Sequence, residues 1–324
     1  MAIESDFNGF PRSLDIDMVG DTAQRIKDEL HRAIVGKDDV IETLFLCLLA
    51  EGHILVEGNP GLAKTTITKL FAQTLGCTFN RQQFTPDLLP ADITGSYVFD
   101  QKTSEFYVRK GGIFANIVMV DELNRATPRT QSALLEAMEE RLVTIEGTTF
   151  PLERPFMVLA TQTMVNLEGT FPLPEVQLDR FYVKMTLDYP STDEELKILN
   201  VKLAEALPIA QVTDREAILR MIDVVRNVYV DEKVLEYIRD IVVSTRNHKD
   251  LMLAASPRAS IALLGMSRVR AAIRGRDYVI PDDVKAIAYD VLNHRMLISP
   301  ESEIEGVTLE EVIAAILMEA RPSR

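Results

Sequence analysis

The sequence lacks most of the features that mark secreted and membrane-spanning proteins. It has two cysteines, Cys47 and Cys77, each in an apolar stretch, so we expect two buried reduced thiols rather than a disulfide. Its longest apolar runs, such as residues 44–50, are far shorter than the ~18 residues that indicate a membrane span. The first residues are acidic and lack the basic and apolar regions of a signal peptide. These absences predict a cytoplasmic protein with no membrane span.

The sequence also has fewer basic than acidic residues. The chain has 35 Lys and Arg against 49 Asp and Glu, which gives a net charge of −14 at pH 7. An acidic protein does not attract nucleic acid by general electrostatics, so the balance argues against a nucleic-acid partner while leaving room for a local basic channel. The composition, 47% hydrophobic and 26% charged, is that of a globular protein, and 324 residues suit two domains.

The strongest motif is a glycine-rich turn between a short apolar run, residues 53–56, and a helical stretch, residues 66–72. Such a turn points backbone N–H groups at one spot, at the positive end of a helix dipole, and this geometry binds phosphate. The sequence therefore predicts a P-loop, with Lys64 reaching the β- and γ-phosphates of ATP and the Thr65 hydroxyl holding Mg²⁺. The expected nucleotide-binding residues are Gly58, Asn59, Pro60, Gly61, Leu62, Ala63, Lys64, Thr65 and Thr66.

One position departs from the strict P-loop pattern, which has glycine immediately before the lysine. Here that residue is Ala63. Alanine adds only a methyl group, so we expect the loop to keep its shape.

Two acids, Asp121 and Glu122, follow the apolar run of residues 117–120. A strand buried on both faces ends here, at the carboxyl edge where open α/β sheets place their ligands. Because a P-loop precedes it, Asp121 is predicted to hold the Mg²⁺ shell and Glu122 to orient the attacking water. The alternative is that both acids are simply solvated at the end of a strand.

Three weaker signals add candidates. A third apolar run ends in the polar residues 161–163, where a side chain would sit beside the γ-phosphate and help to position water. Arg258 lies in the first turn of a helix, where a cation opposes the dipole and a nearby anion such as a γ-phosphate would offset the cost. The Val35–Gly36 step offers a place for an adenine ring. The alternatives are a surface arginine and a plain turn between helices.

The chain changes character near Pro190. Strand-like and helical stretches alternate before it, and the patterns after it are helical. We therefore predict an α/β fold with a parallel sheet at residues 19–189, preceded by a loose arm at residues 1–18 and followed by a smaller all-helical domain at residues 190–324. A helix capped by Asp21 should open the first domain.

Local signals mark further elements. A strand is expected at residues 77–81, and two β-hairpins are expected at residues 95–109 and 142–152. Capping-box patterns that predict helix starts begin at Ser191, Thr213 and Thr308.

The order of P-loop, acidic strand end, polar strand end, later arginine and helical domain resembles the plan of an AAA+ ATPase. Longer stretches are similar to one branch of it, the MoxR family, over about residues 20–320. These stretches are residues 57–65 (EGNPGLAKT), 121–125 (DELNR), 131–141 (QSALLEAMEER), 173–181 (LPEVQLDRF), 256–258 (SPR) and 275–284 (GRDYVIPDDV).

The resemblance implies an ATPase with Mg²⁺ that acts as a ring of identical subunits, typically six. Arg180 would be the arginine finger that completes the neighbouring subunit's site, and Arg258 would be the sensor-2 residue of the helical lid. Alanine at position 63 is usual in the family. Members are thought to act as chaperones that remodel or activate partner proteins, often ones with a von Willebrand factor A domain.

The chain departs from the family at one catalytic position. The family usually has Asn at the end of the third apolar run, whereas this sequence has Thr163. A hydroxyl has one donor where an amide has two, so we expect hydrolysis that is reduced but not absent.

Other functions share the same motifs. A nucleic-acid motor has similar hairpin inserts, but the acidic charge argues against it. The ATPase subunit of a metal chelatase is a relative in architecture, although the four His residues are scattered. A nucleotide-gated binding module with negligible turnover is the third alternative, and Thr163 keeps it open.

Overall fold

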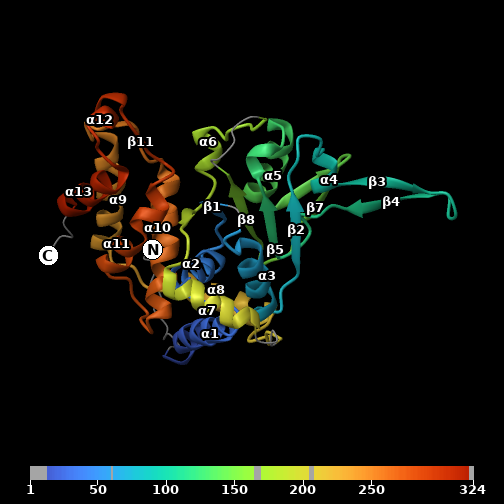
Figure 1. The fold of residues 1–324 in the computed structure, drawn as a ribbon, viewed down its shortest axis with the longest axis horizontal. Helices are drawn as coiled ribbons and strands as arrows, with labels where there is room; N and C mark the ends of the chain where they lie inside the picture. The colour runs from blue at the N-terminus through green and yellow to red at the C-terminus, as the bar shows by residue number, and fades with distance from the viewer. Residues whose placement is uncertain (1–12, 60, 164–168, 204–207, 321–324) are drawn as a thin grey trace, which may run out of the picture.

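The computed structural model describes residues 13–59, 61–163, 169–203 and 208–320. At its centre is a five-stranded parallel sheet in the order β2-β5-β8-β1-β9 (Figure 1). The strands are β1 (Ile54–Gly58), β2 (Phe79–Gln83), β5 (Ile117–Asp121), β8 (Met157–Gln162) and β9 (Val183–Leu187). The predicted α/β class with a parallel sheet is confirmed, and β2 begins two residues later than predicted.

Both faces of the sheet are buried because successive residues along a strand point to opposite sides. Ile54 and Val56 belong to one apolar cluster, which they share with α1, α2 and α3, whereas Leu55 between them belongs to a second cluster under α5. The same alternation runs along β5 and β8. A strand buried on both faces reads as a continuous apolar run, and this is the pattern at residues 117–120.

The helices around the sheet begin with one that is longer than expected. The prediction of a helix capped by Asp21 is wrong, because the helix already starts at Ser13 and Asp21 lies inside it. Ile16 and Val19 are buried in the added turns, and Gly20 lets the helix approach the backbone of Ile273. The helices are α1 (Ser13–His31), α2 (Asp38–Leu49), α3 (Lys64–Thr74), α4 (Pro90–Thr94), η1 (Leu123–Arg125), α5 (Pro128–Glu140) and α6 (Glu175–Leu178).

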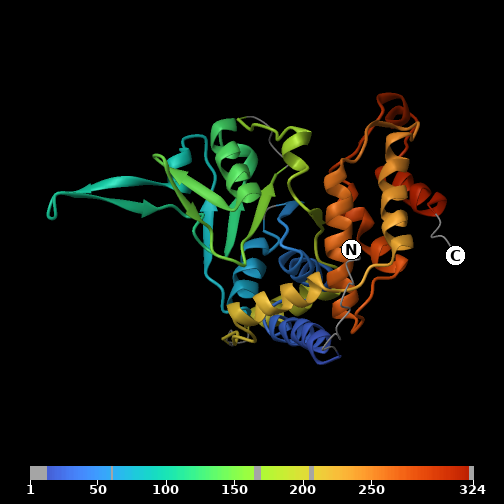
Figure 2. The same ribbon diagram turned by 180° about the vertical axis from the view of Figure 1, so that it is seen from behind.

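Two antiparallel hairpins are inserted beside the sheet, as predicted. The first pairs β3 (Gly95–Asp100) with β4 (Glu105–Lys110) and projects far from the body (Figures 1 and 2). It carries the exposed rings of Phe99, Phe106 and Tyr107. The second pairs β6 (Leu142–Ile145) with β7 (Thr148–Pro151) and lies next to the sheet.

The part of the chain after Pro190 is mainly helical. The structure departs from the all-helical prediction at a short ribbon of β10 (Leu251–Leu253) and β11 (Leu297–Ile298). In this part of the chain, α8 packs on α1 and α2, whereas α9 to α13 form a group beside the core (Figure 1). The helices are α7 (Thr192–Leu203), α8 (Arg215–Arg226), α9 (Glu232–Arg246), α10 (Pro257–Ile273), α11 (Pro281–Leu292), α12 (Pro300–Ile304) and α13 (Leu309–Glu319).

Two of the three predicted capping boxes are present. Those at Ser191 and Thr308 form with Glu194 and Glu311, but the cap of α8 is Asp214, which accepts a hydrogen bond from the Ala217 N–H at 2.8 Å. Asp214 follows Thr213 directly, and both residue types cap helices well, so the sequence could not choose between them. Within the described residues, no helix is both long and apolar enough to cross a membrane.

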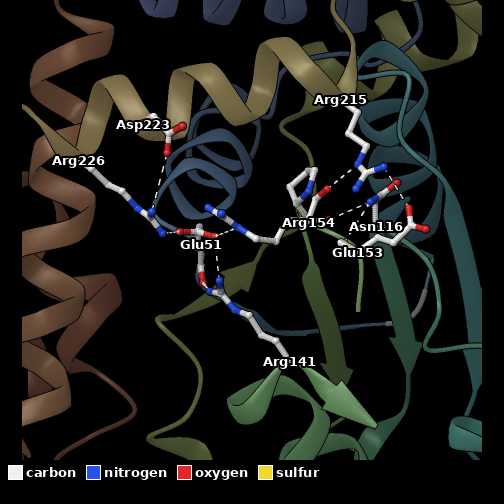
Figure 3. Close-up of polar contacts among 9 residues, drawn as sticks. Glu51, Asn116, Arg141, Glu153, Arg154, Arg215, Asp223 and Arg226 are labelled. Carbon is white, nitrogen blue, oxygen red and sulfur yellow. Dashed lines mark hydrogen bonds and ion pairs between the residues drawn. The ribbon is translucent and has the colours of Figure 1, made fainter. Parts of the chain in front are cut away.

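One partly buried carboxylate, Glu51, connects several of these elements at the turn between α2 and β1 (Figure 3). Arg141 and Arg154, which flank the β6–β7 hairpin, each donate to Glu51 Oε1 at 2.8 Å. Arg226 at the end of α8 donates to Oε2. Burial alone would raise the pKa of the Glu51 carboxyl, but the three guanidinium groups outweigh burial and hold this pKa below its usual value.

We expect Glu51→Gln to lower the free energy of unfolding at neutral pH by about 1–3 kcal/mol, because three arginines lose their shared counter-charge. A carboxylate with a lowered pKa stabilises the fold above its unfolded pKa, and this contribution is lost as the pH falls through the folded pKa. Urea denaturation from neutral to acid pH should therefore show a difference between wild type and variant that shrinks on acidification.

The matched control is Glu153→Gln. The Glu153 carboxylate also pairs with an arginine, Arg215, but its side chain is 72% exposed. We expect a change within about 0.5 kcal/mol for this exposed pair. Equal losses in the two variants would contradict the special role of Glu51.

Candidate functional site

The glycine-rich turn joins β1 to α3, as predicted. Gly58 has a φ of 152°, and a Cβ there would lie 2.9 Å from the Leu187 carbonyl oxygen, so the position requires glycine. Lys64 opens α3, and its ammonium donates to the Gly58 carbonyl at 2.7 Å, which folds the side chain back over the turn. Pro60 lies outside the described residues. The remaining residues of the turn lie together at the end of β1: Leu62 is buried, Thr65 is partly buried, and Gly61, Ala63 and Thr66 are exposed.

Ala63 holds a backbone conformation that glycine adopts more easily. Its φ of 58° and ψ of 18° are left-handed. For a residue with a Cβ this conformation costs roughly 1–2 kcal/mol. The loop keeps its course with alanine, as expected, and the strain explains why the strict pattern has glycine here.

The two acids lie beside this turn. Burial lowers the pKa of Lys64, and the charges of Asp121 and Glu122 oppose that shift, so both carboxylates are within electrostatic reach of the lysine. Asp121 ends β5, is buried, and accepts a hydrogen bond from Arg81 Nε at 2.6 Å. Glu122 accepts one from Gln83 Nε2, also at 2.6 Å.

Arg81 and Gln83 were not among the predicted site residues. They lie on β2, which pairs with β5 so that Gln83 is opposite Asp121. Nothing in the sequence names β2 as the neighbour of the acidic strand, so the contact appears only when the sheet is assembled. The nearest signal is the polar character of residues 80–83, which is unusual in a parallel strand.

The two predicted arginines, Arg180 and Arg258, lie together near the amino-terminal ends of the strands, whereas the P-loop lies at their carboxyl ends. Arg180 pairs with Glu139 Oε2 at 3.2 Å, and Arg258 donates to the second oxygen of the same carboxylate. The anion that we expected near Arg258 is therefore present as Glu139, at the end of α5. These three residues line a pocket of about 200 Å³.

Comparison with known proteins identifies the family of the chain. Residues 53–183 match the profile of the ATPase family associated with various cellular activities (AAA), and residues 243–316 match the AAA lid domain. The chain is 41% identical to Chaperone MoxR1 of Mycobacterium tuberculosis, over 91% of this chain and 81% of that one. It is 45% identical to the uncharacterized protein YeaC of Bacillus subtilis, over 90% and 91%. The chain belongs to the MoxR family of AAA+ ATPases.

The fold agrees with this assignment. The crystal structure of a presumed ATPase from Cytophaga hutchinsonii superposes with a TM-score of 0.90 at 37% identity, over 96% of this chain and 98% of that one. The MoxR-family chain is thus an ATP-hydrolysing P-loop enzyme with an AAA+ core and a helical lid. The predicted family, fold and enzyme class are confirmed.

The remaining predicted residues of this MoxR-family site lie around the P-loop edge. Thr163 follows β8, is partly buried, and accepts a hydrogen bond from Asn124 Nδ2 on its carbonyl at 3.1 Å. The Gly36 backbone is left-handed with a φ of 66°, and the Glu194 side chain lies against it. Val35 precedes it and is partly buried. Their roles toward water and adenine stay predictions.

We expect Ala63→Gly to raise the free energy of unfolding by about 0.5–1 kcal/mol, because glycine relieves the left-handed strain. Urea denaturation measures the change. The matched control is Ala314→Gly on the exposed side of α13, where the same substitution should lower stability by about 0.5–1 kcal/mol. A loss of stability at position 63 as well would contradict the strain.

Proposed function

We propose that this chain hydrolyses ATP in a ring of identical subunits, probing each nucleotide with arginines supplied by the neighbouring subunit. The observation that carries the proposal is the separation of Arg180 and Arg258 from their own P-loop. β9 runs parallel to β1, with Val183 opposite Ile54 and Leu187 opposite Gly58. Arg180 precedes the start of β9, whereas the P-loop follows the end of β1.

The length of the strands makes this separation large. Five residues of parallel strand span roughly 15 Å, which an arginine side chain does not cross through a packed sheet. Arg258 contacts Glu139, the partner of Arg180, and so belongs to the same edge. Two arginines that share one carboxylate keep a net positive charge, which suits a γ-phosphate presented by a neighbour.

In this proposal, residues at the carboxyl ends of the strands bind ATP and hydrolyse it. Backbone N–H groups of residues 58–65, apart from Pro60, which has none, and the Lys64 ammonium hold the phosphates. Glu122 orients a water whose oxygen attacks the γ-phosphorus while the bond to the β–γ bridging oxygen breaks. The proton of the water passes to the Glu122 carboxylate and on to the released phosphate, giving ADP and phosphate. The neighbour's Arg180 and Arg258 stabilise the charge that develops on the transferred group.

Thr65 and Asp121 fit a Mg²⁺ ion. Thr65 lies in the first turn of α3, and the buried carboxylate of Asp121 lies within electrostatic reach of the neighbouring Lys64. Hydroxyl and carboxylate oxygens are ligands that Mg²⁺ prefers. When bound, the ion neutralises phosphate charge. Arg81 holds one oxygen of Asp121, so this arginine would share the carboxylate with the ion.

We propose that the free energy of ATP hydrolysis is used to remodel partner proteins. We propose a ring of six subunits in the cytoplasm, a client with a von Willebrand factor A domain, and remodelling by the two hairpins. A relative of 41% identity is named a chaperone, which supports this role. The exposed aromatic rings on the β3–β4 hairpin offer apolar surface to a client.

Turnover should depend on assembly. We expect the ATPase activity per subunit to rise with protein concentration, because each site needs an arginine from a second chain. Lys64→Ala should abolish activity by removing phosphate contacts, and Arg180→Ala should lower kcat by roughly 10³-fold or more. Steady-state MgATP turnover over a dilution series measures all three.

The control is ATP binding, followed by a fluorescent analogue. Arg180→Ala should bind ATP as wild type does, and Lys64→Ala should not. Activity that is flat with concentration and survives Arg180→Ala would overturn the arginine role while leaving the P-loop assignment intact.

Two substitutions of Thr163 test whether the residue at this position takes part in hydrolysis. We expect kcat to rise about 3- to 10-fold in Thr163→Asn and to fall in Thr163→Ala, following the number of donors available to water and phosphate. ATP affinity should stay constant through the series. An unchanged kcat in both variants would show that Thr163 does not take part in hydrolysis.

A further inference from the structure

The lid directs one deeply buried arginine, Arg295, at the segment that carries Arg180. Arg295 follows α11 and is only 4% exposed. Its guanidinium has five N–H donors, and all five are used. They reach the Asp179 carboxylate at 2.9 Å and the carbonyl oxygens of Asp179 at 3.3 Å, Phe181 at 2.5 Å, Tyr182 at 2.9 Å and Val291.

Four of these five acceptors lie within residues 179–182, on both sides of Arg180. The two residues before Arg295 in the sequence make further hydrogen bonds to this segment. His294 Nε2 donates to the Phe181 carbonyl at 3.0 Å, and Asn293 Nδ2 donates to the Lys184 carbonyl at 3.0 Å. The backbone before β9 and at its start is thus held by consecutive lid residues.

A second lid element touches the same segment. The Ser256 hydroxyl donates to the other oxygen of Asp179 at 2.8 Å. Ser256 is the N-cap of α10, and Arg258 in the next turn contacts Glu139, the partner of Arg180. The start of α10 and the end of α11 therefore meet at the residue just before Arg180.

We propose that Arg295 is the positioning residue of Arg180: by fixing the backbone of residues 179–182 it aims the finger at the neighbouring subunit's site. This inference rests on the role of Arg180 proposed above. Arg295 contacts the segment before β9, at the opposite end of the strands from its own P-loop, so we expect its effect only in the subunit that receives the finger. The lid of one subunit thereby sets the turnover of the next.

Lysine cannot replace this contact. A guanidinium presents its donors in a flat fork that reaches several oxygens at once, whereas an ammonium is a single point. Arg295→Lys keeps the charge beside Asp179 and loses most of the carbonyl contacts. A misplacement of about 1 Å at a catalytic group can cost roughly 100-fold in rate.

The test uses rings mixed from two inactive full-length chains. The donor carries Glu122→Gln, so its own site is dead and its finger is intact. The acceptor carries Arg180→Ala, so its site is intact and its finger is missing. Mixing should restore MgATP turnover at the acceptor site. Arg295→Lys is then placed in the donor only, or in the acceptor only.

We expect Arg295→Lys in the donor to lower kcat of the mixture by roughly 10-fold or more, with KM for ATP unchanged, because the acceptor's P-loop is untouched. The same change in the acceptor should leave turnover within about twofold, since that chain supplies no finger. A general folding defect would lower activity in both arrangements.

The matched control is Arg270→Lys. Arg270 also bridges lid and core, through Glu42 at 2.6 Å, but this contact joins α10 to α2. It should show no difference between donor and acceptor. An inactive parent mixture would overturn the finger role of Arg180 and this inference with it. An active mixture without the donor–acceptor difference would overturn the inference alone.

Discussion

The parallel register of the central sheet is the constraint on which the rest of the molecule depends. Every strand runs in one direction, so whatever follows a strand lies at one edge and whatever precedes a strand lies at the other. The P-loop, Asp121 and Thr163 all follow strands and meet at the carboxyl edge. Glu51 and Arg180 precede strands and lie at the amino edge. In the mechanism that we propose, one subunit therefore presents its phosphate-binding residues on one side and its arginines on the other.

Two carboxylates at the amino edge, Glu51 and Glu139, each have more cations around them than they can neutralise. Glu51 meets three arginines and Glu139 meets two. The chain is acidic as a whole, with a net charge of −14, so this local excess of positive charge is set against the trend of the composition. Arginine supplies every one of these contacts, because its fork can serve several oxygens at once where lysine cannot.

The signals that sequence reasoning read correctly are local ones. The P-loop, the acidic strand end, both hairpins and the caps at Ser191 and Thr308 are written in neighbouring residues. Contacts between distant segments were out of reach: Gln83 meets Glu122 only because β2 pairs with β5, and Arg295 meets residue 179 only because the lid folds back. The dipole argument for Arg258 proposed a γ-phosphate as the nearby anion, whereas the structure places a carboxylate of the core, Glu139, against this arginine.

The apolar cluster on one face of the sheet has a mechanical consequence. It runs without a break from Ile54 in β1 through α2 to Ile287 and Val312 in the lid helices. Separating the lid from the core would expose apolar surface, and each 100 Å² exposed would cost about 2.5 kcal/mol of free energy. Sliding of packed helices keeps this surface covered and so avoids that cost. In the ring that we propose, a lid held to the core in this way would carry its motion to the neighbouring subunit.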